Sequence, residues 1–295
     1  MRIELKKSGS AVSRGFEEGF LSIDLETQVS HCDNYEILPD IEGLILKDLP
    51  ILEAGAGSGR WVIYFHRKGY KIIGIDWSKD LCAMAKNIQP DVRVLQGDIR
   101  TLPFPEGLFG NIIALGSIEH VQEGPQRILN DFYRCLRTNG KVLITAPYLS
   151  PLRQLLLPAR NIFGLLRASR LLRRMLGKTP LKEGFTTRKN ATSNAIDGLF
   201  EDVALSPEGW FFYQYRFTKK QIERYLRQSN FIIEKTWFAF EPEGILHDLG
   251  RPAGRFNYKE GQVLFSLLGK IILKYFSSPE RFGLMICCIG RKGDK

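Results

Sequence analysis

The sequence is poor in cysteine, which occurs at five of 295 positions. No two of these cysteines form a C-x-x-C pair, and their number is odd. Structural zinc sites and disulfide frameworks use paired cysteines at short, repeated spacings, so this pattern argues against both. A chain with free thiols suits a reducing compartment, and we therefore expect a cytoplasmic protein.

Long apolar runs are also missing. No stretch of about 18 residues is both apolar and uncharged, so the sequence predicts no membrane-spanning helix. Residues 1–20 contain no apolar segment of signal-peptide length, and we expect no cleaved leader. Any contact with a membrane would therefore be peripheral.

Acidic residues are nearly absent from one part of the chain. The net charge is +10, and residues 151–190 hold ten lysines and arginines but a single acid, Glu183. The positive excess is therefore concentrated in one segment. Such a patch indicates a local anionic partner, because solubility alone does not require the charge to be concentrated.

Short apolar runs alternate with helical patterns in the first half of the chain. Strands are predicted at 50–53, 71–75, 92–96, 111–115 and 141–146, and helices at 59–68, 78–87 and 124–137. Continuous apolar runs are typical of parallel strands that are buried on both faces. Later strands at 231–240 and 284–290 would complete the sheet. We therefore predict an α/β fold, Rossmann-like and doubly wound, around a mostly parallel seven-stranded sheet.

Two insertions interrupt this alternation. Residues 149–206 are basic and Leu-rich, and residues 241–283 form a second apolar insertion. We expect both to build a helical cap on a core that comprises residues 45–148 and 207–295. Residues 1–44 precede the core as an N-terminal helical segment, in which the pattern of 28–44 predicts one amphipathic helix.

A glycine-rich turn with the sequence ILEAGAGSG begins in the first predicted strand. It places Gly55, Gly57 and Gly59 where the chain must turn sharply and approach a ligand closely. Arg60 stands where a dinucleotide fingerprint has its third glycine, and Glu53 would repel a pyrophosphate. An acid at this position suits a cationic ligand instead, which disfavours an NAD-dependent oxidoreductase.

Two further acids, Asp76 and Asp98, end the next two strands. The carboxyl ends of the strands line the ligand crevice of a doubly wound sheet, so Glu53, Asp76 and Asp98 should converge there. This set resembles the class I S-adenosylmethionine-dependent methyltransferases, especially the group of ubiquinone and menaquinone biosynthesis enzymes. The resemblance covers residues 45–148 well and residues 207–240 loosely. It implies S-adenosylmethionine as the cofactor.

The resemblance also implies a cofactor contact for the residues that follow each strand. Asp76 would accept hydrogen bonds from both ribose hydroxyls, and Trp77 would pack against the adenine. Asp98 would accept from the adenine amino group, with Ile99 covering the ring. The glycine turn would border the methionine part of the cofactor, with Leu115-Gly116 under its carboxyl end.

The candidate general base is His120, which follows the fourth strand in the motif Gly-Ser-Ile-Glu-His. An imidazole titrates near neutral pH and could take a proton from an acceptor hydroxyl. The other interpretation is that His120 only shapes the pocket. The adjacent Glu119 resembles metal-binding acids of ubiquinone-pathway O-methyltransferases. Those enzymes have a further acid three residues earlier, where this chain has Gly116, so we expect no metal site.

The basic insertion leaves several interpretations open. Arg153, Arg160, Arg167 and Arg174 recur every seven residues among leucines, which keeps them near one helix face. Residues 151–189 could therefore lie on an anionic membrane surface, or form a lid whose arginines are solvated. RNA could also bind them. However, the fourth strand lacks the Asn/Asp-Pro-Pro-aromatic run of enzymes that methylate nucleic-acid amino groups, so we expect no nucleic-acid partner.

Together these features predict an enzyme that transfers a methyl group from S-adenosylmethionine to an oxygen or nitrogen atom. The expected acceptor is a small molecule or is lipid-like. Two alternatives remain, which are an RNA-directed methyltransferase that uses the basic insertion and a protein that binds the cofactor without catalysis.

Overall fold

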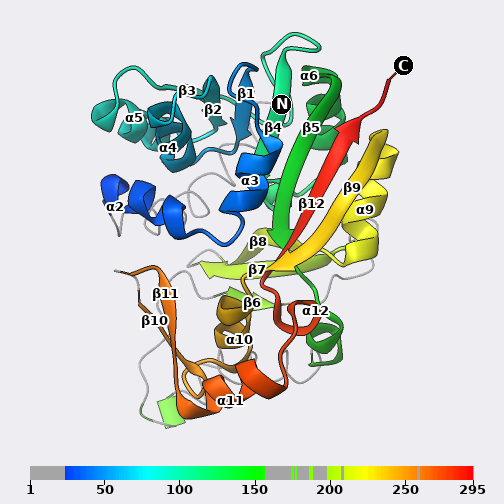
Figure 1. Ribbon diagram of the computed structural model, residues 1–295. Coiled ribbons are helices and arrows are strands. Elements are labelled where there is room, and N and C mark those ends of the chain that lie inside the picture. The colour runs from blue at the N-terminus through cyan, green and yellow to red at the C-terminus, as the bar shows by residue number, and fades with distance from the viewer. Residues whose placement is uncertain are drawn as a thin grey trace.

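A seven-stranded sheet forms the centre of the protein (Figure 1). The structure is a computed structural model that describes residues 24–156, 174–175, 177, 186–188, 198–206, 209–257 and 260–294. The strands of this sheet are β1 (Ile51–Ala54), β2 (Ile72–Asp76), β3 (Arg93–Gln96), β4 (Phe109–Leu115), β5 (Leu136–Pro147), β9 (Phe231–Ala239) and β12 (Met285–Lys292). They lie in the order β3-β2-β1-β4-β5-β12-β9. The strands from β1 to β5 are parallel, and β12 is antiparallel to both neighbours, which confirms the predicted sheet.

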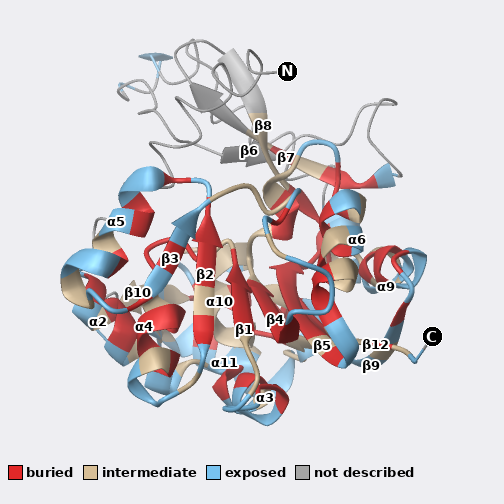
Figure 2. Ribbon diagram, turned by 90° about the horizontal axis from the view of Figure 1, so that it is seen from above, coloured by how far each residue is buried: buried red, intermediate tan, exposed pale blue. Residues whose placement is uncertain are grey.

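Helices cover both faces of the sheet. One face packs against α2 (Leu25–Ser30), α3 (Leu38–Leu44), α4 (Arg60–Arg67) and α5 (Lys79–Ile88), and the other against α6 (Gln126–Cys135) and α9 (Lys219–Gln228). The apolar sides of these helices form two buried clusters with the strands between them (Figure 2). Every residue of β1 is buried, which explains why its sequence is a continuous run without alternation.

Local sequence signals mark the ends of several helices. Thr218 and Gln221 form a reciprocal capping box at the start of α9. The Ser78 hydroxyl accepts from the Leu81 backbone N–H at the start of α5. Gly69, with φ 84°, follows the last residue of α4 and its cap.

The prediction of one amphipathic helix over residues 28–44 is wrong. The chain forms α2, a 3₁₀ turn η1 (His31–Asn34) and α3, with Tyr35 extended after η1. Pro39 lies in the first turn of α3, and a proline inside a continuous helix would lack its N–H and clash with the carbonyl four residues earlier, which here belongs to the extended Tyr35. The break turns the Tyr35 ring into the core, 5.2 Å from the Trp61 ring centroid.

The two insertions lie beyond the carboxyl ends of the parallel strands (Figure 1). Residues 151–156 are helical, and β6 (Thr186–Arg188), β7 (Phe200–Ser206) and β8 (Gly209–Arg216) form a three-stranded antiparallel sheet. The second insertion contains α10 (Glu241–Leu249), β10 (Gly254–Asn257), β11 (Gln262–Phe265), α11 (Leu267–Tyr275) and α12 (Pro279–Phe282). The insertions therefore contribute strands as well as the predicted helices. None of the helices within the described ranges is both long and apolar enough to cross a membrane.

Arg153 does not belong to an exposed basic face, which corrects the prediction from the seven-residue spacing. Its side chain is fully buried and forms an ion pair of 2.9 Å with Asp248 of α10. Its guanidinium also donates to backbone carbonyls at the end of β5 and after α12. Arg174 is exposed, and Arg160 and Arg167 lie outside the described residues.

Candidate active site

The turn after β1 brings two loops of the sheet together. Gly55, Gly57 and Gly59 all have positive φ, at 78°, 54° and 78°. A Cβ atom on Gly55 would lie only 2.4 Å from the Ser117 Cβ, so a side chain there would push the loop after β4 away. The Ser117 hydroxyl donates to the Ala54 carbonyl at 2.9 Å. The loops after β1 and β4 are therefore in close contact at the point where the strand order reverses.

Asp76, which ends β2, reaches across to the glycine turn. Its buried carboxylate accepts from the backbone N–H of Gly57 at 2.8 Å and from that of Ser78 at 2.9 Å. Asp76 therefore holds the turn in shape, at the position that the resemblance assigns to a ligand of the ribose hydroxyls.

Glu53, which lies within β1, has a buried carboxyl group whose Oε2 atom has no hydrogen-bond partner among the described residues. Burial raises the pKa of Glu53 to about 8, although the positive charge of Arg60 lowers it in part. The Arg60 guanidinium itself lies over the Tyr35 ring, 5.2 Å from its centroid. A cationic ligand would stabilise the ionised form of Glu53, so the site favours such a ligand.

The predicted adenine side of the crevice is more open. Trp77 has 51% of its surface exposed, so one face of its ring is accessible. Asp98 is engaged by Arg100, whose Nε donates to both carboxylate oxygens at 3.0 and 2.9 Å. Although burial opposes it, this contact holds the pKa of Asp98 below its ordinary value. No feature of the sequence indicated that Arg100 would bind Asp98. Ile99, which lies between them in the chain, is half-buried.

The loop after β4 carries Glu119 and His120 on a short 3₁₀ turn, η2 (Ile118–His120). A Cβ on Gly116, which has φ 72°, would lie 3.6 Å from Glu119 Oε1 and 3.8 Å from the Met285 Cε. The Glu119 side chain is buried, and its Oε2 has no hydrogen-bond partner in the described part of the chain. Burial raises the pKa of Glu119 to about 8, so the group is largely protonated at neutral pH.

His120 lies against Tyr213 of β8. Its Nδ1 is 2.9 Å from the Tyr213 backbone carbonyl, which can only accept, so Nδ1 carries the proton. The two rings meet edge to face with centroids 5.5 Å apart. Burial lowers the pKa of His120 to about 4, and the imidazole is therefore neutral at pH 7 with an unprotonated Nε2. No sequence signal pointed to Tyr213 as the partner, because 93 residues separate the pair.

The crevice residues fit S-adenosylmethionine. A buried carboxyl oxygen without a partner at Glu53 matches an ammonium donor, and the open face of Trp77 matches a flat base. The structure brings together Glu53, Asp76 and the three glycines, as predicted. The Asp98 carboxylate, in contrast, accepts hydrogen bonds from Arg100. Among the described residues, no group of three or more His, Cys, Asp or Glu side chains is placed to hold a metal ion.

The parallel sheet, its switch point and the acids at the ends of β1 and β2 define the fold of class I methyltransferases. Residues 52–144 match the family described as methyltransferase domain. Over residues 52–144 the chain therefore matches a methyltransferase domain, and the sheet that contains these residues has the class I fold.

Two curated relatives are similar over this region. One is a phosphatidylethanolamine N-methyltransferase of Cereibacter sphaeroides, 32% identical over 101 residues, which cover 32% of this chain and 48% of the relative. The other is a chloroplastic 2-methyl-6-phytyl-1,4-hydroquinone methyltransferase of Arabidopsis thaliana, 29% identical over 104 residues, which cover 34% of this chain and 30% of the relative. The chain thus spans half or less of the length of these relatives.

The fold itself extends over most of the chain. A solved S-adenosylmethionine-dependent methyltransferase from Methanosarcina mazei aligns with a TM-score of 0.56 at 16% identity, covering 87% of this chain and 98% of that one. At this identity the match shows a shared fold.

Proposed function

We propose that the whole protein is a methyltransferase that uses S-adenosylmethionine and methylates an oxygen or nitrogen atom of a small-molecule or lipid-like acceptor. The observation that carries this proposal is the pair Glu119 and His120 at the end of β4. His120 Nε2 lies 3.8 Å from Glu119 Oε1, too far for a hydrogen bond between them. An acceptor hydroxyl or amine could bridge the two atoms, which would fix its position.

S-adenosylmethionine supplies a methyl group on a positively charged sulfur and leaves as a neutral thioether. The Glu53 carboxylate would hold its ammonium group, and Asp76 would hold the ribose hydroxyls. Trp77 would cover the adenine, while Asp98 would accept from its amino group if Arg100 yields one carboxylate position. Because the leaving group is neutral, alignment and exclusion of water by these residues are expected to supply much of the rate.

His120 would act as an acceptor for the proton of the attacking group. Its Nδ1–H is committed to the Tyr213 carbonyl, which fixes the ring and directs Nε2 to one side. With a pKa of about 4, the ring is neutral at pH 7 and is a weak base. It is therefore suited to orienting a hydroxyl or amine and accepting its proton as the new bond forms, and not to removing that proton beforehand.

The apolar character of the acceptor is supported by the side chains beyond the site. Met285 and Tyr213 bring apolar surface close to η2. The relatives named for phosphatidylethanolamine and for a phytyl hydroquinone act on lipid-like acceptors, which agrees with this proposal.

The test combines cofactor binding with methyl transfer. Titration calorimetry should show micromolar binding of S-adenosylhomocysteine by the wild type and none by Asp76→Ala, with NAD as the negative control. Transfer of radiolabelled methyl groups should then label the organic phase of a cell extract. Glu119→Gln and His120→Gln should reduce that transfer at least tenfold while they keep cofactor binding.

Other results would change the proposal. Label recovered in RNA, lost when the arginines of 160–188 are neutralised, would favour the nucleic-acid alternative. Cofactor binding without label in lipid, aqueous or RNA fractions would favour a non-catalytic protein. Localisation in the cytoplasm, with peripheral contact of residues 151–189 with an anionic membrane, belongs to the same proposal, and vesicle binding that depends on those arginines would test it.

A further inference from the structure

The second insertion exposes an unusual amount of apolar surface. Among the described residues, sixteen large apolar side chains are exposed, and six of them fall within residues 267–276. These six are Leu267, Leu268, Ile271, Leu273, Tyr275 and Phe276. Scattered exposed apolar residues are normal on a protein surface, but a cluster on one helix indicates an interaction site.

Most apolar side chains of α11 are exposed to solvent, whereas an ordinary surface helix buries its apolar side chains. Its inner side is set by Gly269, where an added Cβ would lie 2.1 Å from the Ala253 carbonyl oxygen. Ile272, three residues on, packs against the buried cluster of Ile245, Ala253 and Phe282. Both inner residues lie on one face, as helical geometry requires of positions three apart.

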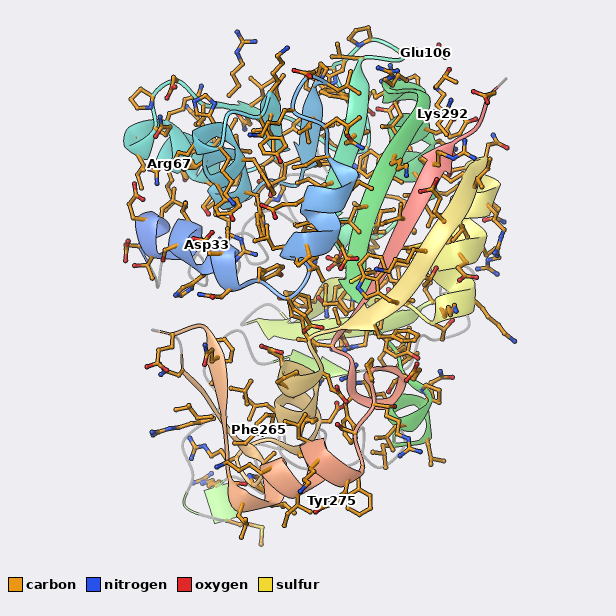
Figure 3. The ribbon with its side chains drawn as sticks, in the orientation of Figure 1. Asp33, Arg67, Glu106, Phe265, Tyr275 and Lys292 are labelled. Carbon is orange, nitrogen blue, oxygen red and sulfur yellow. The ribbon has the colours of Figure 1, made fainter. Side chains whose placement is uncertain are left out.

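Leu267, Leu268, Ile271 and Tyr275 lie along one exposed side of α11, at the spacings of a helical stripe. Their exposed fractions are 77%, 49%, 41% and 67%. Figure 3 shows Tyr275 on the side of α11 that faces away from the rest of the chain. This helix therefore presents a continuous apolar stripe to solvent.

Positive charge borders this stripe. Lys270 and Lys274 are exposed on α11, and the Lys274 ammonium lies 5.1 Å from the Tyr275 ring centroid. Residues 261–278 contain no aspartate or glutamate. An apolar stripe flanked by lysines without acids is complementary to the interface of a bilayer with anionic headgroups, where apolar groups enter the acyl boundary and ammonium groups meet phosphate.

The first insertion adds to the same end of the molecule. Leu152 packs against the cluster that also supports Ile272, and Leu155 and Leu156 follow it with exposed side chains. The buried ion pair between Arg153 and Asp248 joins the two insertions. Because α11 lies at the far side of the cap from the sheet (Figure 1), its stripe is accessible without any movement of the core.

We propose that α11 is a docking element that binds the surface of a bilayer containing anionic lipids. The stripe Leu267, Leu268, Ile271 and Tyr275 enters the interface, and Lys270 and Lys274 contact headgroup phosphates. This surface is made of other residues than the basic ones of 151–189, and the proposal does not depend on methyl transfer. It would place the cap, and with it the carboxyl ends of the strands, toward the membrane.

The test is co-sedimentation of the full-length protein with vesicles of phosphatidylcholine and phosphatidylglycerol at 70:30, compared with pure phosphatidylcholine. The wild type should bind the mixed vesicles, and more weakly at high salt. Leu267→Glu with Ile271→Glu should weaken binding at least tenfold. Lys270→Gln with Lys274→Gln should weaken it about thirtyfold, because each lysine near such a surface contributes about fivefold.

Matched controls separate this surface from general effects. Leu46→Glu with Ile232→Glu changes two exposed apolar residues outside the two insertions. Lys86→Gln with Lys220→Gln removes two exposed lysines, also outside the insertions. Both pairs should bind vesicles like the wild type. Binding of S-adenosylhomocysteine should be unchanged in every variant, which shows that the core is folded and keeps this test distinct from that of methyl transfer.

Three outcomes would overturn the docking role of α11. The first is wild-type binding that the α11 substitutions leave intact, especially if neutralising the arginines of 160–174 abolishes it. The second is equal binding to pure phosphatidylcholine, which would remove the role of the lysines. The third is a wild-type dimer that Leu267→Glu with Ile271→Glu converts to a monomer without any vesicle binding, which would make the stripe an interface between copies.

Discussion

The Asp76 carboxylate accepts a hydrogen bond of 2.8 Å from the Gly57 backbone N–H, and this bond ties the end of β2 to the turn after β1. The acid that the family resemblance assigns to the ribose therefore also fixes the turn that faces the cofactor. Its two functions can be separated by measuring stability and ligand binding on the same variants.

Replacement of Asp76 by alanine should impair both functions. The Gly57 and Ser78 N–H groups lose a buried acceptor, and we expect a loss of about 1–3 kcal/mol in the free energy of unfolding. Binding of S-adenosylhomocysteine should fall below detection in calorimetry. Asp80→Ala, at an exposed position of α5, is the matched control and should change neither quantity. A stable Asp76→Ala protein with wild-type affinity would contradict the assignment.

The raised pKa of Glu53 predicts how cofactor binding depends on pH. Its pKa is about 8 in the unliganded protein, and an ammonium ligand favours the ionised form, so binding should release a proton below that pH. The dissociation constant of S-adenosylhomocysteine should rise about tenfold for each pH unit from 8 to 6. Calorimetry in buffers of different ionisation enthalpy would count the proton. Glu53→Gln should bind more weakly, with no such slope.

The same carboxyl group affects the stability of the unliganded protein with a defined sign. Between the ordinary value of 4.5 and the folded pKa of about 8, the folded state holds a proton that the unfolded chain has lost. The contribution of Glu53 to stability is therefore full below pH 4.5 and is lost as the pH rises to 8. Urea unfolding of the wild type and Glu53→Gln at pH 5 and 8 would measure it, and an equal difference at both pH values would contradict the shift.

Much of the core could be predicted from the sequence because its signals are local. Continuous apolar runs, the capping box of Thr218 and Gln221 and the glycine after α4 each act within a few residues. The break in residues 28–44 was missed because one proline outweighed a regular apolar pattern. The pairing of β6, β7 and β8 was not predicted, because β6 lies within the basic insertion, which was expected to be helical.

The candidate site shows the same division. The acids at Glu53 and Asp76 were predictable because their positions at strand ends fix where they meet. The contacts of His120 with Tyr213 and of Arg153 with Asp248 span 93 and 95 residues, and no periodicity reports them. The seven-residue spacing placed Arg153 on a solvated face, whereas its distant partner made burial possible.

His120 should remain neutral across the physiological range. Because burial lowers its pKa to about 4, the imidazole should not titrate between pH 5.5 and 8. Nitrogen NMR of labelled protein should show one protonated nitrogen, Nδ1, with His120→Gln used to assign the signal. The neutral ring adds stability that is full above pH 6.5 and is lost as the pH falls toward 4. A signal that titrates near pH 6.5 would rule out the buried, carbonyl-bonded ring.

The ion pair of Arg153 and Asp248 should dominate the stability of the cap. Both side chains are nearly inaccessible, and Arg153→Met would take the permanent cation from a buried carboxylate that His247 also contacts at 3.0 Å, at a cost of about 3–5 kcal/mol. Arg153→Lys should recover only part of this, because an ammonium group cannot reproduce the fork that reaches Asp248 and the Gly283 carbonyl together. The double variant Arg153→Met with Asp248→Asn should cost less than the sum of the single changes, since it leaves no unpaired charge. Urea unfolding of the wild type, Arg153→Met, Asp248→Asn and the double variant measures this coupling. Additive effects would show that the two groups are energetically independent.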